Sequence, residues 1–183
     1  MLSYIKQYKP FLLFLGKFMG SYIILIFVYQ LFLDQFDRSN YEPDSMTTLV
    51  AYNTRDLIRF AGYEVALLRH DSEPSYRIFV NNHSVARIVE GCNAISVMIL
   101  FVAFVIAFRG SFKRTVLFII FGIILLHLLN VGRVAALVLG LVHYPQFEHL
   151  MHDIVFPLFI YGVVFALWVI WINKFSLYAR KTQ

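Results

Sequence analysis

Four long apolar stretches are the feature of this sequence that most limits how the chain can fold. They cover residues 11–33, 92–108, 116–142 and 154–172. A helix needs about 20 predominantly apolar residues to cross the hydrocarbon core of a bilayer. Of the 183 residues, 60% are hydrophobic and only 15% are charged, against about 45–50% and about 25% in soluble domains. We therefore predict a mainly α-helical, multi-pass integral membrane bundle with four transmembrane helices, and we exclude an ordinary soluble enzyme.

The charged residues predict how these helices are oriented. Segments 1–10, 109–115 and 173–183 carry lysine and arginine but neither aspartate nor glutamate, and all eleven acidic residues lie in 34–91 or 143–153. Basic residues accumulate in the short cytoplasmic segments of membrane proteins. We therefore expect both termini to be cytoplasmic and the two acidic regions to face outward. The net charge of +5 reflects this sorting, so we expect no nucleic acid as a partner.

The region 34–91 predicts a folded insertion between the first two spans. Asp44 and the four residues after it supply N-cap candidates for a helix that continues to about Phe60, and Gly62 is placed to end this helix. We expect an extracytoplasmic helix that lies along the membrane surface, followed by a β-hairpin or small antiparallel sheet, all within one membrane domain, 1–183. The strand candidates are the segments rich in β-branched and aromatic residues, 63–69, 76–80 and 85–89.

Arg133 is the residue of the third span that most needs an explanation, because an ionisable side chain near the bilayer centre costs about 2.5–3.5 kcal/mol. In one interpretation its guanidinium extends to the outer interface. In the other, the guanidinium faces the bundle interior and binds an anion or oxyanion. Asn130, three residues earlier on the same helix face, favours the interior position. His127 continues a related face, and we interpret it as a hydrogen-bonded core histidine.

Cys92 is the single cysteine, so it cannot form an intrachain disulfide. Free cysteines are usually small buried hydrophobic residues, but this one is predicted at the outward start of the second span. The partial positive charge of a helix N-terminus favours the nucleophilic thiolate. The backbone N–H groups of Asn93 and Ala94 are candidates to stabilise an oxyanion there.

The loop before the fourth span is rich in histidine. Glu148, His149, His152 and Asp153 fall within about one helical turn. A solvated polar loop is the simplest interpretation, and a histidine that moves protons is the second. A metal site is a third, but no HxxxH or HExxH spacing is present, so we expect neither a metal nor another cofactor.

The predicted orientation places Cys92, Arg133 and His152 at the same outer interface, although they come from three different spans. A thiol, a guanidinium and an imidazole suit acyl transfer. In that chemistry the thiol attacks a peptide carbonyl, the guanidinium stabilises the oxyanion and the imidazole moves protons. His149 is a rival to His152, because both lie in the same turn, and we retain Asn130, Asn93 and His149 as supporting candidates.

These residues resemble a known family. A cysteine that opens a span, an Asn-x-x-Arg sequence in the next span (130–133) and a histidine before the last span are similar to the exosortase/archaeosortase family of membrane cysteine transpeptidases. The resemblance covers about residues 47–172, and the Gly-Cys-Asn-Ala-Ile-Ser stretch looks most like the small F-type exosortases of the Bacteroidetes. The commoner family pattern has Ser-Gly after the cysteine, where this chain has Asn93-Ala94.

The resemblance implies that Cys92 is the nucleophile, Arg133 the oxyanion-stabilising residue and His152 the proton-transferring residue. It also implies a substrate class, an exported protein with a C-terminal sorting signal made of a short recognition motif, a hydrophobic span and a basic tail. The resemblance implies an enzyme of the cell inner membrane with its active site facing the periplasm. Such an enzyme cleaves at the motif on the outer face and passes the acyl group to an acceptor. The expected partners are this substrate, the lipid bilayer and, as a further candidate, a small membrane accessory protein.

A non-enzymatic membrane subunit is the alternative hypothesis. Arg133, Asn130 and His127 would then form a polar stripe that binds a partner helix, which leaves Cys92 without a role. A transporter is a third hypothesis, but four spans without an internal repeat make a poor transporter monomer.

Overall fold

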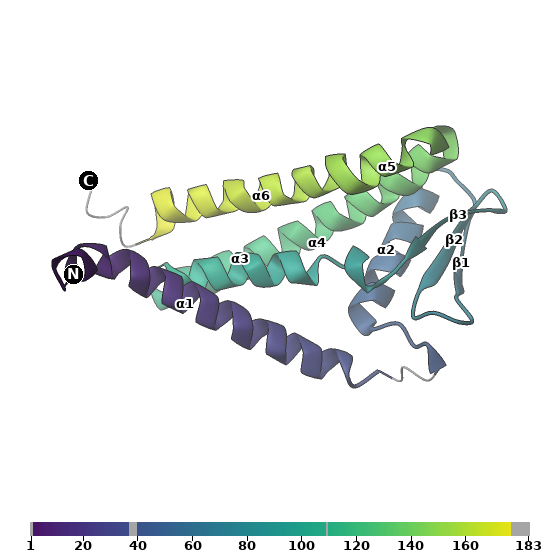
Figure 1. Ribbon diagram of the computed structural model, residues 1–183. Helices are drawn as coiled ribbons and strands as arrows, with labels where there is room; N and C mark the ends of the chain where they lie inside the picture. The colour runs from purple at the N-terminus through teal and green to yellow at the C-terminus, as the bar shows by residue number, and fades with distance from the viewer. Residues whose placement is uncertain (1, 37–39, 109, 177–183) are drawn as a thin grey trace. The chain divides into compact units, whose positions relative to one another are not determined.

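The computed structural model describes residues 2–36, 40–108 and 110–176 (Figure 1). These residues form two compact units. The first unit comprises the described parts of Met1–Leu31, Ile95–Ile124 and Gly162–Gln183. The second unit comprises the described parts of Phe32–Ala94 and Leu125–Tyr161.

Three helical segments of the described chain are long and apolar enough to cross a membrane: Tyr8–Leu33, Phe112–His143 and Pro145–Phe175. The first belongs to helix α1, Leu2–Leu33, and the second is helix α4, Phe112–His143. These segments confirm three of the four predicted spans. The third segment joins several helical elements: a 3₁₀ turn Pro145–Phe147, α5 (Glu148–Leu150), a π turn Met151–Val155, α6 (Phe156–Ile170) and a π turn Trp171–Phe175.

The predicted second span, 92–108, is shorter in the structure. Helix α3 covers Ile95–Ala107, which is 13 residues. At a rise of about 1.5 Å per residue it extends about 20 Å, less than the roughly 30 Å of a hydrocarbon core. A fourth full-length span is therefore not confirmed. The predicted start at Cys92 is wrong, because Cys92 lies in a separate 3₁₀ turn, Glu90–Cys92.

Aromatic rings pack α1 against α3 in the first unit. Phe14 contacts Phe108 with ring centroids 4.6 Å apart, and Phe18 contacts Phe104 at 6.3 Å. The residue numbers rise along α1 as they fall along α3, so the two helices run antiparallel. The end of α3 therefore lies beside the first half of α1.

The same unit holds α4 close to α3 at Gly122. A Cβ atom added at this glycine would lie 2.2 Å from the ring of Phe101, which is fully buried. Only a residue without a side chain permits this approach. An isolated antiparallel β-bridge also joins Gly110 to Ser176 in this unit.

Helix α2 of the second unit, Ser45–Phe60, begins and ends where the sequence predicts. The side chain of Asp44 accepts hydrogen bonds from the backbone N–H groups of Met46 (2.9 Å) and Thr47 (3.0 Å), and so caps the helix. Gly62 adopts a φ of +91°, and its N–H donates to the carbonyl of Arg59 at 2.9 Å. This left-handed residue closes the helix in the way that glycine favours.

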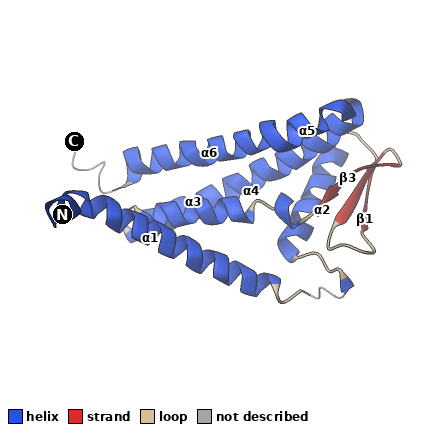
Figure 2. Ribbon diagram, viewed as in Figure 1, coloured by secondary structure: helices blue, strands red, loops and turns tan. Residues whose placement is uncertain are grey.

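A three-stranded antiparallel sheet follows α2 (Figure 2). The order is β1 (Val65–Arg69), β2 (Tyr76–Val80) and β3 (His83–Ile88). The predicted sheet is thus confirmed, with strand ends shifted by one or two residues. Asn81 and Asn82 both have positive φ angles, 49° and 68°, as a two-residue type I′ hairpin turn requires. The hairpin therefore brings the chain straight from β2 into β3.

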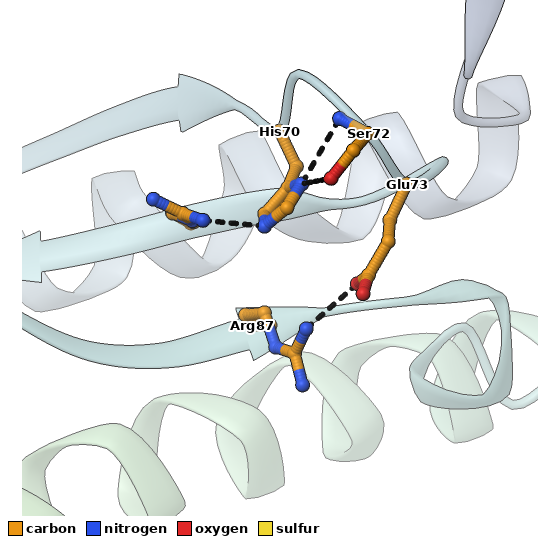
Figure 3. Close-up of polar contacts among 5 residues, drawn as sticks. His70, Ser72, Glu73 and Arg87 are labelled. Carbon is orange, nitrogen blue, oxygen red and sulfur yellow. Dashed lines mark hydrogen bonds and ion pairs between the residues drawn. The ribbon is translucent and has the colours of Figure 1, made fainter.

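The loop between β1 and β2 is held by polar contacts (Figure 3). Arg77 Nη2 lies 2.6 Å from His70 Nε2. The backbone N–H of Ser72 donates to His70 Nδ1 at 3.3 Å, and the Ser72 hydroxyl lies 3.3 Å from the same nitrogen. Glu73 reaches across to β3, where it forms an ion pair with Arg87 at 2.7 Å. These contacts fix the loop end of the sheet.

One hydrophobic core joins α2, the sheet and the second half of α4 in the second unit, and Cys92 packs against it, partly buried. Burial of branched aliphatic side chains stabilises such a core by about 1.5–3 kcal/mol per side chain. The most completely buried members are Val50, Ala51 and Ile58 of α2, Ile78, Val80 and Ile88 of the sheet, and Val138 of α4. The core thus places the single cysteine beside α4.

Candidate functional site

Cys92 is the last residue of the 3₁₀ turn, and helix α3 begins three residues later. The N–H of Cys92 donates to the carbonyl of Val89 at 2.8 Å, and the N–H of Asn93 donates to the carbonyl of Glu90 at 3.0 Å. The prediction that the Asn93 N–H faces an oxyanion is therefore wrong, because this donor is used within the turn. The thiol of Cys92 is thus carried by a hydrogen-bonded 3₁₀ turn and not by the first turn of α3.

Ala94 connects this turn to α3 in an unusual backbone conformation. Its φ is +60°, and the residue is buried. For a residue with a Cβ, the left-handed region costs about 1–2 kcal/mol. The family pattern that the sequence resembles has glycine at this position, and glycine adopts such a φ without the steric cost of a Cβ.

Asn130 of α4 binds the cysteine residue directly. Its side chain is fully buried, and its Nδ2–H donates to the backbone carbonyl of Cys92 at 2.7 Å. A buried hydrogen bond of this kind fixes its partner, because breaking it leaves polar groups unsatisfied. The predicted supporting role of Asn130 thus has a structural basis in the contact with Cys92.

The Asn93 side chain ties the same turn to α2. Its Nδ2–H donates to the hydroxyl of Thr47 at 3.3 Å, and that hydroxyl donates to the carboxylate of Asp44. All three side chains are buried. Sequence reasoning singled out Asp44 and Thr47 only as helix-cap candidates, and no local signal links them to residue 93. The helix cap of α2 and the support of the cysteine turn are therefore one network.

Arg133 lies one helical turn from Asn130 on α4 and is half-buried. Its guanidinium interacts electrostatically with the Cys92 thiol and with the hydroxyl of Tyr161. Its Nε is buried and has no hydrogen-bond partner within the described part of the chain. The structure therefore brings together the predicted pair of thiol and guanidinium. Tyr161 was missed from the sequence, because a tyrosine within an apolar helix gives no signal of its own.

The histidine loop has a different organisation from the one expected. Asp153 holds both histidines: His152 Nδ1 lies 2.8 Å from its Oδ1, and His149 Nε2 lies 3.1 Å from its Oδ2. Within the described part of the chain, Glu148 forms no ion pair with either histidine. Among the described residues, neither imidazole is hydrogen-bonded to Cys92 or Arg133. Asp153 is the acid that orients the loop histidines.

His127 is bound within the chain, as its interpretation as a core histidine predicts. Its Nε2 lies 3.1 Å from the side-chain nitrogen of Asn53 on α2. Because an amide nitrogen only donates, Nε2 is the acceptor. Of the polar stripe on α4, His127 therefore binds α2 and Asn130 binds the cysteine turn, so two of its three members already have partners in this chain.

The described residues contain no group of three or more histidine, cysteine, aspartate and glutamate side chains arranged to bind a metal ion. The arrangement around Cys92 instead offers a thiol, a nearby guanidinium and rigid backbone support. These are the elements of nucleophilic acyl transfer.

Of three comparisons with known proteins, one gives a match. No curated protein and no solved structure matches the chain. The resemblance to the F-type exosortases of the Bacteroidetes accordingly stays a prediction. One family model, described as Transmembrane exosortase (Exosortase_EpsH), matches residues 12–175. This range includes the sheet, Cys92 and all of the three apolar helical segments except residues 8–11, and the chain therefore belongs to the transmembrane exosortase family.

Proposed function

We propose that this chain is an integral membrane cysteine peptidase and transpeptidase, in which Cys92 forms an acyl-enzyme with an exported protein. The substrate carries a C-terminal sorting signal and is cleaved at the periplasmic face of the inner membrane. The observation that carries the proposal is the position of Cys92: Asn130 holds its carbonyl at 2.7 Å, and the Arg133 guanidinium interacts with its thiol. Membership of the exosortase family supports the same class of reaction.

The proposed reaction has two steps. Cys92 gives its proton to a loop histidine, and its Sγ attacks the carbonyl carbon of the scissile peptide bond, which forms a C–S bond. The C–N bond then breaks, the departing amine takes the proton from the histidine, and a thioester remains. In the second step an acceptor amine, hydroxyl or water attacks the thioester, loses its proton to the histidine and releases the thiolate.

Arg133 has the role of stabilising the oxyanion that forms in both steps. A guanidinium inside a membrane protein acts in surroundings of low dielectric, where one well-placed donor contributes about 100- to 1,000-fold in rate. The buried Nε of Arg133 and its proximity to the thiol support this role.

His152 is the first candidate for the proton-transferring residue, with His149 as its rival. Asp153 supports either choice, because it contacts both imidazoles. Catalytic hydrogen bonds are often long or absent in an enzyme without substrate and form in the substrate complex. In this proposal the bound substrate brings the loop histidine to the leaving amine.

We propose that both termini lie in the cytoplasm. This orientation requires α3 to return the chain across the membrane, although it is only 13 residues long. The antiparallel packing of α1 and α3, with Phe108 against Phe14, supports such a return. The segments 1–10 and 109–115, whose charged residues are all basic, then both lie on the cytoplasmic side.

The decisive experiment replaces the nucleophile. An exported protein with a sorting motif, a hydrophobic span and a basic tail is co-expressed with this chain, and its processing is followed by gel shift. We expect Cys92→Ala and Cys92→Ser to abolish processing, while both variants accumulate in the membrane at the level of the unsubstituted chain. Unchanged processing by a stably accumulated variant contradicts the proposal.

A matched pair of variants separates the two histidines. His149→Gln and His152→Gln remove imidazoles that contact opposite oxygens of the same carboxylate. We expect His152→Gln to stop processing and His149→Gln to slow it only a few-fold. The reverse order assigns the proton transfer to His149, and normal processing by both variants excludes the loop from the reaction.

A non-enzymatic subunit is less well supported. That hypothesis uses the polar stripe of α4 to bind a partner helix, but His127 and Asn130 already bind Asn53 and Cys92. Modification of Cys92 in cells permeabilised only at the outer membrane separates the two hypotheses. A membrane-impermeant thiol reagent labels Cys92 if the enzyme proposal is correct, and absence of labelling favours the subunit.

A further inference from the structure

The charged side chains of the first unit are all basic. Its three segments contain no aspartate or glutamate at all, whereas the second unit contains all eleven acidic residues. No carboxylate side chain of this unit is therefore available to pair with its cations. The basic residues of its segments are Lys6, Lys9, Lys17, Arg109, Lys113, Arg114, Lys174, Arg180 and Lys181.

A groove in this unit brings two of these cations over an apolar wall. It has a volume of about 430 Å³ and lies between the first turns of α4 and the last turns of the final helical segment. Arg114 and Lys174 supply its charge, and Phe118, Phe121 and Leu167 are among the residues of its apolar wall. Within the described residues, neither Arg114 nor Lys174 forms an ion pair.

A second groove of the unit repeats this chemistry on different helices. It has a volume of about 450 Å³ and is lined by Lys9 and Lys17 of α1, by the ring of Phe14, and by Phe108 at the end of α3. Two grooves, each lined by two cations and by aromatic rings, are therefore present, and both include residues at the ends of the apolar helices.

We propose that the groove between Arg114 and Lys174 binds an anionic phospholipid, with its phosphate at the two cations and an acyl chain along Phe118, Phe121 and Leu167. Basic grooves between membrane helices bind anionic headgroups. The charge selects an anionic lipid over a zwitterionic one, because no carboxylate is available in this unit to accompany the choline or ethanolamine group. The apolar wall selects a lipid over a free phosphate, because only a lipid also covers the rings.

Tryptophan fluorescence can report this binding in the full chain. Trp171 is fully buried, and its ring lies 5.0 Å from that of Phe118, which lines the groove. The only other tryptophan is Trp168, so Trp168→Phe leaves one reporter. The protein is reconstituted into phosphatidylcholine vesicles that contain increasing fractions of dibrominated phosphatidylglycerol or dibrominated phosphatidylcholine, because bromine quenches a neighbouring indole.

We expect half-maximal quenching at a mole fraction on the order of ten-fold lower for brominated phosphatidylglycerol than for brominated phosphatidylcholine. One basic residue at an anionic surface contributes about 1 kcal/mol, or about five-fold in binding. Arg114→Gln is therefore expected to reduce the preference about five-fold, and Arg114→Gln with Lys174→Gln is expected to abolish it. Arg114→Lys keeps the charge and is expected to retain most of the preference.

Lys113→Gln is the matched control. Lys113 precedes Arg114 in the first turn of α4 and carries the same charge, but it does not line the groove. It is expected to leave the preference unchanged. Equal quenching by the two lipids in the unsubstituted groove overturns the proposal, as does an equal loss in Lys113→Gln and Arg114→Gln, which indicates diffuse surface charge. Processing of the sorting-signal substrate is a separate measurement, since no residue of the groove belongs to the proposed active site.

Discussion

At the scale of single residues, the most informative feature is that two polar residues on one helix face both act on Cys92. Asn130 and Arg133 are three residues apart on α4; Asn130 donates to the backbone carbonyl of Cys92, and the Arg133 guanidinium interacts electrostatically with its thiol. Asn130 fixes the position of the nucleophile, whereas Arg133 provides the charge that the developing oxyanion requires.

Arg133→Lys tests the second of these roles. Lysine keeps the positive charge but is a point charge with no planar fork of donors. We expect the rate of substrate processing to fall about 100-fold or more. The measurement is a time course of processing at equal membrane levels of protein. A rate within a few-fold of the unsubstituted chain contradicts the oxyanion role.

Ala94→Gly tests the strain beside the nucleophile. Glycine adopts a φ of +60° without the steric cost that a Cβ imposes. We expect the free energy of unfolding in detergent to rise by about 1 kcal/mol. Ala103→Gly, in the interior of α3, is the control; it is expected to lower stability by about 1 kcal/mol. If both variants are destabilised, the positive φ at residue 94 carries no strain.

At the scale of elements, the N-terminus of α2 has two tasks, because the carboxylate that caps the helix also accepts the Thr47 hydroxyl that supports Asn93. Stability of the helix and placement of the cysteine turn are therefore linked through Asp44.

Asp44→Ala is accordingly expected to lower the free energy of unfolding by about 1–2 kcal/mol and also to slow processing. Asp56→Ala, on the exposed side of the same helix, removes a carboxylate whose only ion pair among the described residues is with the neighbouring Arg55; its effect is expected to stay within about 0.5 kcal/mol. Denaturation in detergent and the processing assay measure the two effects. Normal processing in Asp44→Ala would show that the network does not support the turn.

The success of sequence-based prediction differed among elements for physical reasons. The N-cap of α2, its end at Gly62 and the Asn81-Asn82 turn were predictable, because each depends on residues within a few positions of one another. The separate turn at Cys92 was not, since an apolar run does not reveal that Ala94 interrupts the helix with a positive φ. Contacts such as Asn53 with His127 join residues 74 positions apart and leave no local pattern.

At the scale of the whole molecule, the chain separates its charges by sequence segment. The acidic residues belong to the unit that contains the sheet and Cys92, and the unit with the antiparallel α1 and α3 carries basic residues only. This separation is the basis of the proposed orientation across the membrane.

Reporter fusions test that orientation. A periplasm-dependent alkaline phosphatase is expected to be active when inserted in the hairpin at Asn82 and inactive when fused in the basic turn at Gly110 or after Gln183. A cytoplasm-dependent reporter at the same three positions is the control and should give the opposite pattern. Activity of the phosphatase at Gly110 would show that α3 does not return the chain to the cytoplasm.

The hydrogen bond between Asn130 and Cys92 has a consequence for how the protein meets bilayers of different thickness. Helices respond to hydrophobic mismatch by tilting or shifting along their axes. Because Asn130 anchors the cysteine turn to α4 within one turn of Arg133, such a displacement carries the thiol and the guanidinium together. We therefore expect the distance between the Cys92 thiol and the Arg133 guanidinium to stay the same in bilayers of different lipid composition.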